Sequence, residues 1–171
     1  GYNNLPKTPT LARQALAQSK ETQLPIASLR QRLVAAGFQE AINYSFIDPS
    51  LALSLYPDQE TVSLQNPLST EMSVMRPSIL PGLLTTLEYN LNRQRDRVRL
   101  FETGLVFELR EGVIEQTRKI AGLIYGAAQP VSWTQAKDGV DFFDLKGIVE
   151  SLIDLGLGVE SVEFRAATHP S

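Results

Sequence analysis

The sequence contains no cysteine, which excludes a disulfide framework and thiolate metal sites and fits a reducing cytoplasm. It contains one histidine, His169, so neither a Ser-His-Asp triad nor a multi-histidine metal site can be built. No apolar run approaches the roughly 20 residues that span a bilayer, and Gly1–Asn4 lacks the pattern of a signal peptide. These absences predict a cytoplasmic protein with no membrane segment and no metal site.

The sequence also lacks an excess of positive charge. Its 16 basic and 19 acidic residues give a net charge of −3, so no global field attracts phosphate backbones. The dense basic patch is Arg93, Arg95, Arg97 and Arg99, diluted by Asp96. We interpret it first as cations at the end of a helix that continue into a solvated turn, with contact to RNA phosphate or to an acidic partner as the alternatives.

Hydrophobic periodicity predicts an α+β domain, an antiparallel β-sheet flanked by helices. Two apolar strands joined by a hairpin turn at Glu111-Gly112 should form the centre, because both faces of the first strand are apolar. The predicted elements are a helix from Pro25 closed by Gly37, a strand over 41–46, a short helix capped by Asp48, a strand over 61–64, a helix from Pro81, strands over 98–109 and 118–127, a helix over 142–153 closed by Gly156, and a strand over 161–164.

The composition divides the chain into two regions. Residues 1–24, rich in Pro, Thr, Gln and Lys, predict the tail of a preceding domain and a linker, and residues 25–171 predict one core domain. Both ends resemble cuts, so we expect the chain to be a piece of a longer protein.

Several other side chains are candidates for binding or catalysis. Asp141, Asp144 and Lys146 cluster at the start of the last helix, where an N-cap role is favoured over acid/base chemistry. Trp133 is either a partner anchor or a cover for the sheet edge. Arg76 either faces a partner or packs at the entry of a helix.

A set of segments, taken in order and with their spacing, resembles the phenylalanyl-tRNA synthetase beta chain family over nearly the whole chain. The segments are Gly1–Pro6, Leu33–Glu40, Tyr44–Phe46, Asn66–Ser69, Ser73–Leu84, Tyr89–Gln94, Arg99–Gly104 and Phe143–Gly147. The resemblance implies the class II aminoacyl-tRNA synthetase catalytic-core-like fold. It also implies that the chain is part of the beta subunit of phenylalanine–tRNA ligase.

The resemblance further implies a set of partners. In that family two beta chains pair with two catalytic alpha subunits in a heterotetramer, which charges tRNA(Phe) with phenylalanine and uses ATP and magnesium. The expected role of this chain is a non-catalytic domain that scaffolds the alpha subunit. The alternatives are an ATP-binding ligase domain completed by residues outside the chain, and a tRNA-binding module. The negative charge and the lack of an aromatic platform beside the arginines disfavour the latter.

The residues that correspond to the family's reaction motifs do not match them. The catalytic pattern places one residue between an arginine and a glutamate on a strand, whereas two residues separate Arg99 from Glu102. On a strand this offset puts the two side chains on opposite faces, so Arg99 is predicted to make an ion pair or an interface contact. No Glu-Arg pair follows Gly156-Leu157-Gly158, which is better interpreted as a helix cap. We therefore predict no catalytic, cofactor-binding or metal residue, and an inactive isolated chain.

Overall fold

A long β-hairpin forms the centre of the domain in the computed structural model, which describes residues 24–130, 138–156 and 162–167. Strands β4 and β5 each have 14 residues and pair antiparallel from Arg97↔Gly126 to Arg110↔Val113. Glu111 and Gly112 both have positive φ, at 51° and 79°, as a two-residue turn that follows the twist of the strands requires. The predicted hairpin and its turn are confirmed.

Four helices and short strands surround this hairpin. In chain order the elements are α1 (Ile26–Ala35), β1 (Gln39–Glu40), β2 (Phe46–Ile47), α2 (Pro49–Leu55), the 3-10 helix η2 (Thr70–Met72), β3 (Val74–Met75), α3 (Leu80–Leu91), β4 (Arg97–Arg110), β5 (Val113–Gly126) and α4 (Phe142–Ile153). The α+β class is confirmed. The main sheet has the order β1-β4-β5, and β1 runs parallel to β4, so the sheet is mixed and not purely antiparallel. Strands β2 and β3 form a second, antiparallel pair.

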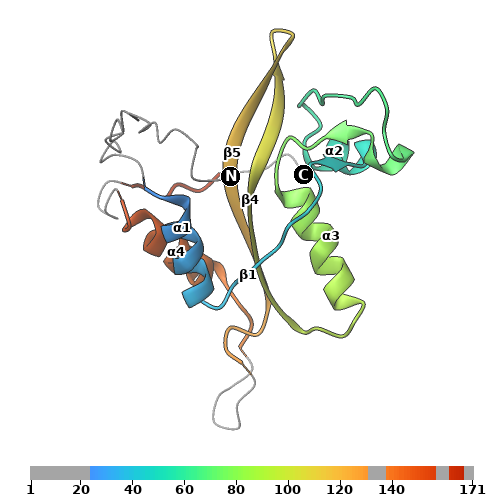
Figure 1. The fold of residues 1–171 in the computed structure, drawn as a ribbon. Helices are drawn as coiled ribbons and strands as arrows, with labels where there is room; N and C mark the ends of the chain where they lie inside the picture. Colours follow the sequence, from blue (N-terminus) through green and yellow to red (C-terminus); the bar gives the residue numbers. More distant parts are fainter. Residues whose placement is uncertain (1–23, 131–137, 157–161, 168–171) are drawn as a thin grey trace, which may run out of the picture.

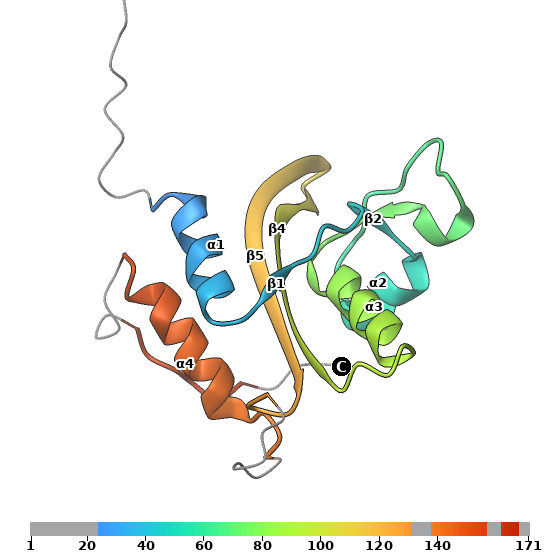
Figure 2. The same cartoon turned by 60° about the horizontal axis from the view of Figure 1, so that its bottom comes forward.

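The helices cover the two faces of β4 separately. Helices α1 and α4 lie on one side of the hairpin, and α2 and α3 lie on the other (Figures 1 and 2). Because side chains alternate along a strand, the even-numbered apolar residues of β4 face α3 and Phe101 faces α1. The first core cluster consists of Ile79, Leu83, Val98, Leu100 and Val106. The second consists of Leu33, Phe38 and Phe101. Strand β4 is therefore buried on both faces, as the sequence predicted.

Local signals in the sequence fix several helix ends. Helix α1 ends in a Schellman motif, because the amide of Gly37 donates to Val34 O and the amide of Phe38 donates to Leu33 O. Gly37 adopts φ +83°, which confirms its predicted role. At the start of α2 the side chain of Asp48 accepts a hydrogen bond from the amide of Ser50 at 2.7 Å, which confirms the predicted cap.

Three predicted features of the chain trace are wrong. The strand expected over 41–46 is reduced to Phe46 at the start of β2, with 41–45 outside any strand. The strand over 61–64 is reduced to one bridge, Ser63↔Val74, because β3 is itself only two residues long. Residues 162–164 form no strand, while Ser161 lies outside the described residues.

The end of α4 differs from the prediction. Helix α4 ends at Ile153, and its C-cap residue Asp154 has a right-handed backbone conformation. Gly156 does not adopt the left-handed conformation of a C-cap glycine. The predicted role of Gly156 as that kind of cap is therefore wrong. Across the described ranges, no helix has the length and apolar character needed to cross a membrane.

Candidate functional site

A buried ion pair stands at the middle of β4, on the face that packs against α3. Arg76, directly after β3, donates from Nη1 to Glu102 Oε1 at 2.6 Å, and the two side chains are 3% and 4% exposed. The Arg76 Nε donates to Leu105 O at 3.0 Å, and Nη1 also lies 3.5 Å from Tyr44 O. A buried pair needs partners for its remaining donors and acceptors, and these contacts supply them for Nε and Nη1 of Arg76. Of the two predictions for Arg76, internal packing is confirmed and direct contact with a partner is wrong.

The second oxygen of Glu102 is held by an amide from a different segment. Asn43 Nδ2 donates to Glu102 Oε2 at 2.7 Å, and Thr86 in α3 donates from Oγ1 to Asn43 Oδ1 at 2.9 Å. We call the four side chains of Thr86, Asn43, Glu102 and Arg76 the polar network. Asn43 and Thr86 were not among the predicted site residues, and the available signal was a glutamate between the apolar residues Leu100 and Val106 of one strand face.

Two glycines make room for the polar network. A Cβ on Gly104 would lie 2.0 Å from Arg76 Nη2, and a Cβ on Gly82 would lie 2.9 Å from the Cβ of Asn43. Real Cβ atoms do not approach neighbours this closely, so any side chain at Gly104 or Gly82 displaces a member of the network. The two glycines are thus required by close packing and not by backbone conformation.

Arg99 lies on the opposite face of β4 from Glu102, as predicted. Its Nη2 donates to Ala128 O at 2.7 Å, and its guanidinium carbon lies 5.9 Å from the centre of the Phe38 ring. Its Nε is buried and has no partner among the described residues. Burial lowers the pKa of Arg99, with a smaller contribution from the charge of Arg97. Within the described part of the chain Arg99 forms no ion pair, and its predicted interface contact stays a prediction.

The arginine patch is divided by the fold. Arg93 packs over the Tyr89 ring, 3.2 Å from its centre, and donates to Tyr89 O at 3.1 Å at the end of α3. Arg97 donates from Nε to Ala127 O at 3.2 Å. The predicted placement of cations at a helix end is confirmed for Arg93. One aromatic ring, Tyr89, lies beside the patch, and Arg93 itself covers one face of it.

The acidic cluster at the start of α4 serves as a cap. Asp141 accepts hydrogen bonds from the amides of Phe143 and Asp144, and the Asp144 side chain accepts one from the amide of Asp141, which completes a capping box. Lys146 pairs with Glu150 at 3.4 Å. The predicted capping role is confirmed.

Trp133, Leu157, Gly158 and His169 lie outside the described residues. In the described ranges, no group of three or more histidine, cysteine, aspartate or glutamate side chains is arranged to hold a metal ion.

An extended segment with exposed apolar side chains adjoins the polar network. Between β1 and β2 the chain crosses from the side of α1 to the side of α3 (Figure 2). The side chains alternate here, because Asn43 points inward to Glu102 while Ile42 and Tyr44 are 92% and 64% exposed. We call residues 42–44 the exposed segment. Within the described ranges, their backbone amides donate no hydrogen bond, although an unpaired amide in extended chain is suited to accept another strand.

A pocket of about 380 Å³ opens beside the exposed segment. It extends the segment's apolar surface towards α2 and α3. Its lining includes Tyr44, Phe46, Leu51, Met72 and Thr85. The exposed segment and this pocket form a continuous apolar area of the kind that marks a protein interface.

Comparison with solved structures identifies the class of protein that has this fold. A pyrrolysyl-tRNA synthetase from Desulfitobacterium hafniense matches with a TM-score of 0.52 and 17% identity, over 76% of this chain and 46% of that chain. An ATP phosphoribosyltransferase regulatory subunit/histidyl-tRNA synthetase from Bacillus halodurans matches with a TM-score of 0.50 and 11% identity, over 70% of this chain and 34% of that chain. The fold is therefore that of the class II tRNA synthetases.

Comparison of sequences identifies the family within that class. Residues 5–171 match the model of the phenylalanyl tRNA synthetase beta chain CLM domain. The phenylalanine–tRNA ligase beta subunit of Pseudomonas putida is 47% identical over 171 residues, and that of Photorhabdus laumondii is 44% identical over 174 residues. The chain belongs to the phenylalanyl-tRNA synthetase beta chain family. In each case the match covers 100% of this chain and 22% of the relative, so the chain spans about a fifth of their length.

Proposed function

We propose that this chain is the synthetase-like domain of a longer beta subunit of phenylalanine–tRNA ligase, and that it scaffolds the catalytic alpha subunit. Residues 1–24 would be the tail of a preceding domain with a linker, and residues 25–171 the core domain. The assembly would contain two alpha and two beta subunits in the cytoplasm. The alpha subunit would use ATP and magnesium to charge tRNA(Phe).

The disposition of charge on β4 supports a non-catalytic role. A nucleotide site of this kind needs positive side chains that are free to meet phosphate charge as it develops. Arg76 is instead buried against Glu102, and Arg99 lies on the other face of the strand and donates to Ala128 O. The described residues of β4 thus do not fit a nucleotide, and we assign no step of the reaction to them.

The observation that carries the scaffold proposal is the exposed segment. An isoleucine that is 92% exposed, next to a tyrosine that is 64% exposed, leaves apolar surface in water. Covering a side chain of this size by a partner stabilises a complex by roughly 1.5–3 kcal/mol. Within the described ranges the backbone amides of the same residues donate no hydrogen bond, which adds a second means of attachment, because a strand of the alpha subunit can pair with them.

The test is titration calorimetry of the full-length beta subunit with the alpha subunit, using Ile42→Asp. We expect at least a tenfold loss of affinity, because an aspartate in an apolar interface carries its charge out of water. The matched control is Val113→Asp, which replaces an apolar side chain that is 64% exposed at the end of the hairpin. Equal affinity of wild type and Ile42→Asp would contradict the proposal. A separate titration of the isolated 171-residue chain with ATP and magnesium should give no binding heat.

A further inference from the structure

The polar network connects four parts of the chain that are distant in sequence. Asn43 lies 59 residues from Glu102 and 43 residues from Thr86, and Arg76 lies 26 residues from Glu102. The orientation of the Asn43 amide is fixed by chemistry. An ionised carboxylate only accepts hydrogen bonds, so the NH₂ group must face Glu102 and the oxygen must face the hydroxyl of Thr86.

This network holds the exposed segment in place of a β-ladder. The amide of Ala41 still donates to Phe101 O at 2.8 Å, but beyond it the chain leaves β4. The contacts that follow are the Asn43 side chain, the approach of Arg76 Nη1 to Tyr44 O, and the amide of Arg76, which donates to Ser45 O at 2.9 Å. Side chains i and i+2 of extended chain share a direction, so an inward Asn43 sets Ile42 and Tyr44 outward.

We infer that the polar network is a positioning device that holds Ile42 and Tyr44 in the orientation in which the alpha subunit binds them. This inference rests on the proposed scaffold function. Its physical basis is preorganisation, because a segment that is already ordered pays less conformational entropy when it binds. The polar network would then determine affinity. Asn43 turns away from the interface, and the other three side chains lie beneath it.

Thr86 provides the sharpest test, because it acts on the exposed segment only through Asn43. Thr86→Val keeps the shape of the side chain and removes the hydroxyl, whose single proton faces both Asn43 Oδ1 and Gly82 O at 2.9 Å, so Asn43 Oδ1 loses its donor. Thr86→Ser keeps the hydroxyl and should rescue the interaction. The matched control is Thr103→Val in β4, because the Thr103 hydroxyl accepts a hydrogen bond from Arg30 Nη2 at 2.7 Å, outside the polar network and outside the lining of the pocket.

The variants are made in the full-length beta subunit and titrated with the alpha subunit by calorimetry. Thr86→Val should weaken binding roughly tenfold, the factor that corresponds to ordering about one backbone residue on binding. Thr86→Ser and Thr103→Val should bind within about twofold of wild type, since both leave the network intact. Hydrogen exchange in the free subunit should show faster exchange at the amides of Ala41 and Arg76 in Thr86→Val only. These amides donate to Phe101 O and Ser45 O at the two ends of the exposed segment, which loses its anchor while the fold persists.

The possible outcomes separate this inference from the proposed function. If Ile42→Asp loses affinity but Thr86→Val binds as wild type, the positioning role is overturned and the scaffold remains. Equal losses in Thr86→Val and Thr103→Val would also overturn it, since the effect would then follow the loss of any threonine hydroxyl beside β4 and not the polar network. If Ile42→Asp binds as wild type, the scaffold proposal fails and the positioning role fails with it.

Discussion

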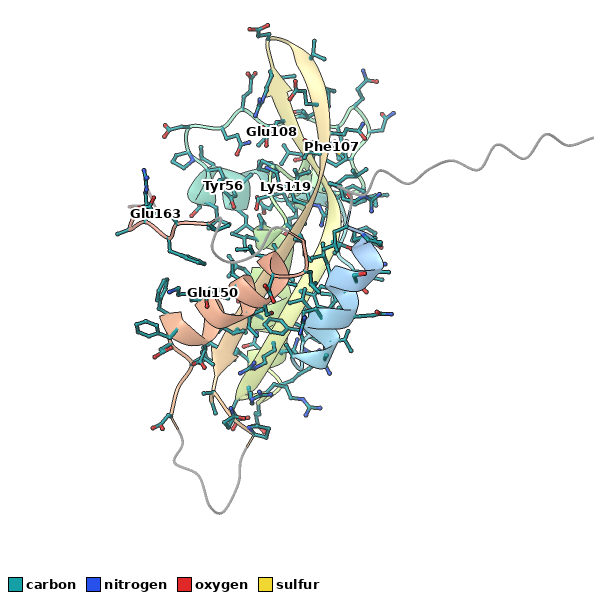
Figure 3. The ribbon with its side chains drawn as sticks, turned by 90° about the vertical axis from the view of Figure 1, so that its left-hand side faces the viewer. Tyr56, Phe107, Glu108, Lys119, Glu150 and Glu163 are labelled. Atoms are coloured by element: carbon teal, nitrogen blue, oxygen red, sulfur yellow. The ribbon has the colours of Figure 1, made fainter. Side chains whose placement is uncertain are left out.

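Two clusters of charged side chains lie on the same face of β4. Both contain a glutamate paired with basic side chains, but they differ in solvent exposure. Glu102 is 4% exposed and pairs with Arg76, which is 3% exposed. Glu108, further towards the hairpin turn, is 18% exposed and pairs with Lys119 at 3.0 Å and Arg110 at 2.8 Å, which are 48% and 65% exposed. Figure 3 labels Glu108 and Lys119 on the hairpin.

Burial determines which segments of the chain each cluster connects. The buried pair must have every donor and acceptor satisfied, so it recruits Asn43 and two backbone carbonyls and thereby joins separate segments. The exposed cluster is screened by water and needs no such partners, so it connects only the two strands of the hairpin. Burial converts the same ion pair from a local contact into a tertiary connection.

The largest expected effect comes from breaking the buried pair. Arg76→Met keeps most of the side-chain volume but leaves Glu102 buried and without its counter-charge, so the free energy of unfolding should fall by about 3–5 kcal/mol. Urea denaturation of the chain gives this value. Replacing both partners, as Arg76→Met with Glu102→Leu, should recover most of the loss, because no buried charge remains. A loss below 1 kcal/mol in the single variant would contradict the comparison.

An intermediate effect is expected from Gly104→Ala, which tests the packing of the buried pair without removing a charge. The added Cβ would lie 2.0 Å from Arg76 Nη2, and the guanidinium cannot move without breaking its bonds to Glu102 and Leu105 O. Overpacking of this kind costs about 1–3 kcal/mol in the free energy of unfolding.

The control for this substitution is Gly147→Ala in α4. No atom lies within 4 Å of a Cβ built there, and alanine in a helix interior is more favourable than glycine by about 0.5–1 kcal/mol. The same urea measurement should therefore show opposite signs for the two glycine variants. Equal effects would mean that the polar network tolerates the added methyl group.

The smallest effect is expected in the exposed cluster. Glu108→Gln should lower the free energy of unfolding by at most about 1 kcal/mol, and 1 M salt should remove most of the difference between the variant and wild type. A loss as large as that of Arg76→Met would erase the distinction between the clusters.

The same glutamate predicts a pH dependence. Hydrogen bonds from Lys119 and then Arg110 lower the pKa of Glu108. A group with a lowered pKa in the folded state stabilises the fold above its ordinary pKa, and this contribution is lost as the pH falls through the folded-state value. The difference in stability between wild type and Glu108→Gln should thus be constant at neutral pH and shrink in acid, which denaturation at several pH values can measure.

The sequence predicted those parts of the fold that depend on neighbouring residues. Gly37 closes α1, Asp141 caps α4 and Glu111-Gly112 turns the hairpin, and each signal lies within a few residues of the structure that it specifies. The split of Arg99 and Glu102 between two faces was also predictable, because strand alternation is a local rule.

The sequence misled where pairing depended on distant segments. Residues 41–46 alternate as a strand does, yet residues 41–45 form none, because the chain leaves β4 after Ala41. For the candidate site, the sequence drew attention to Arg76 and Glu102 separately and assigned neither to the other. Asn43 and Thr86 carried no signal, because each is an ordinary polar residue until the fold places it beside a buried carboxylate.

The caps, the turns and the central strand could be predicted from short-range periodicity in the sequence. The family could be predicted from motifs that occur in a fixed order. Which charges are buried together and which apolar side chains remain in water depends on tertiary packing. The Asn43–Glu102 contact spans 59 residues of sequence, and a contact of that range is set by packing and not by any local preference.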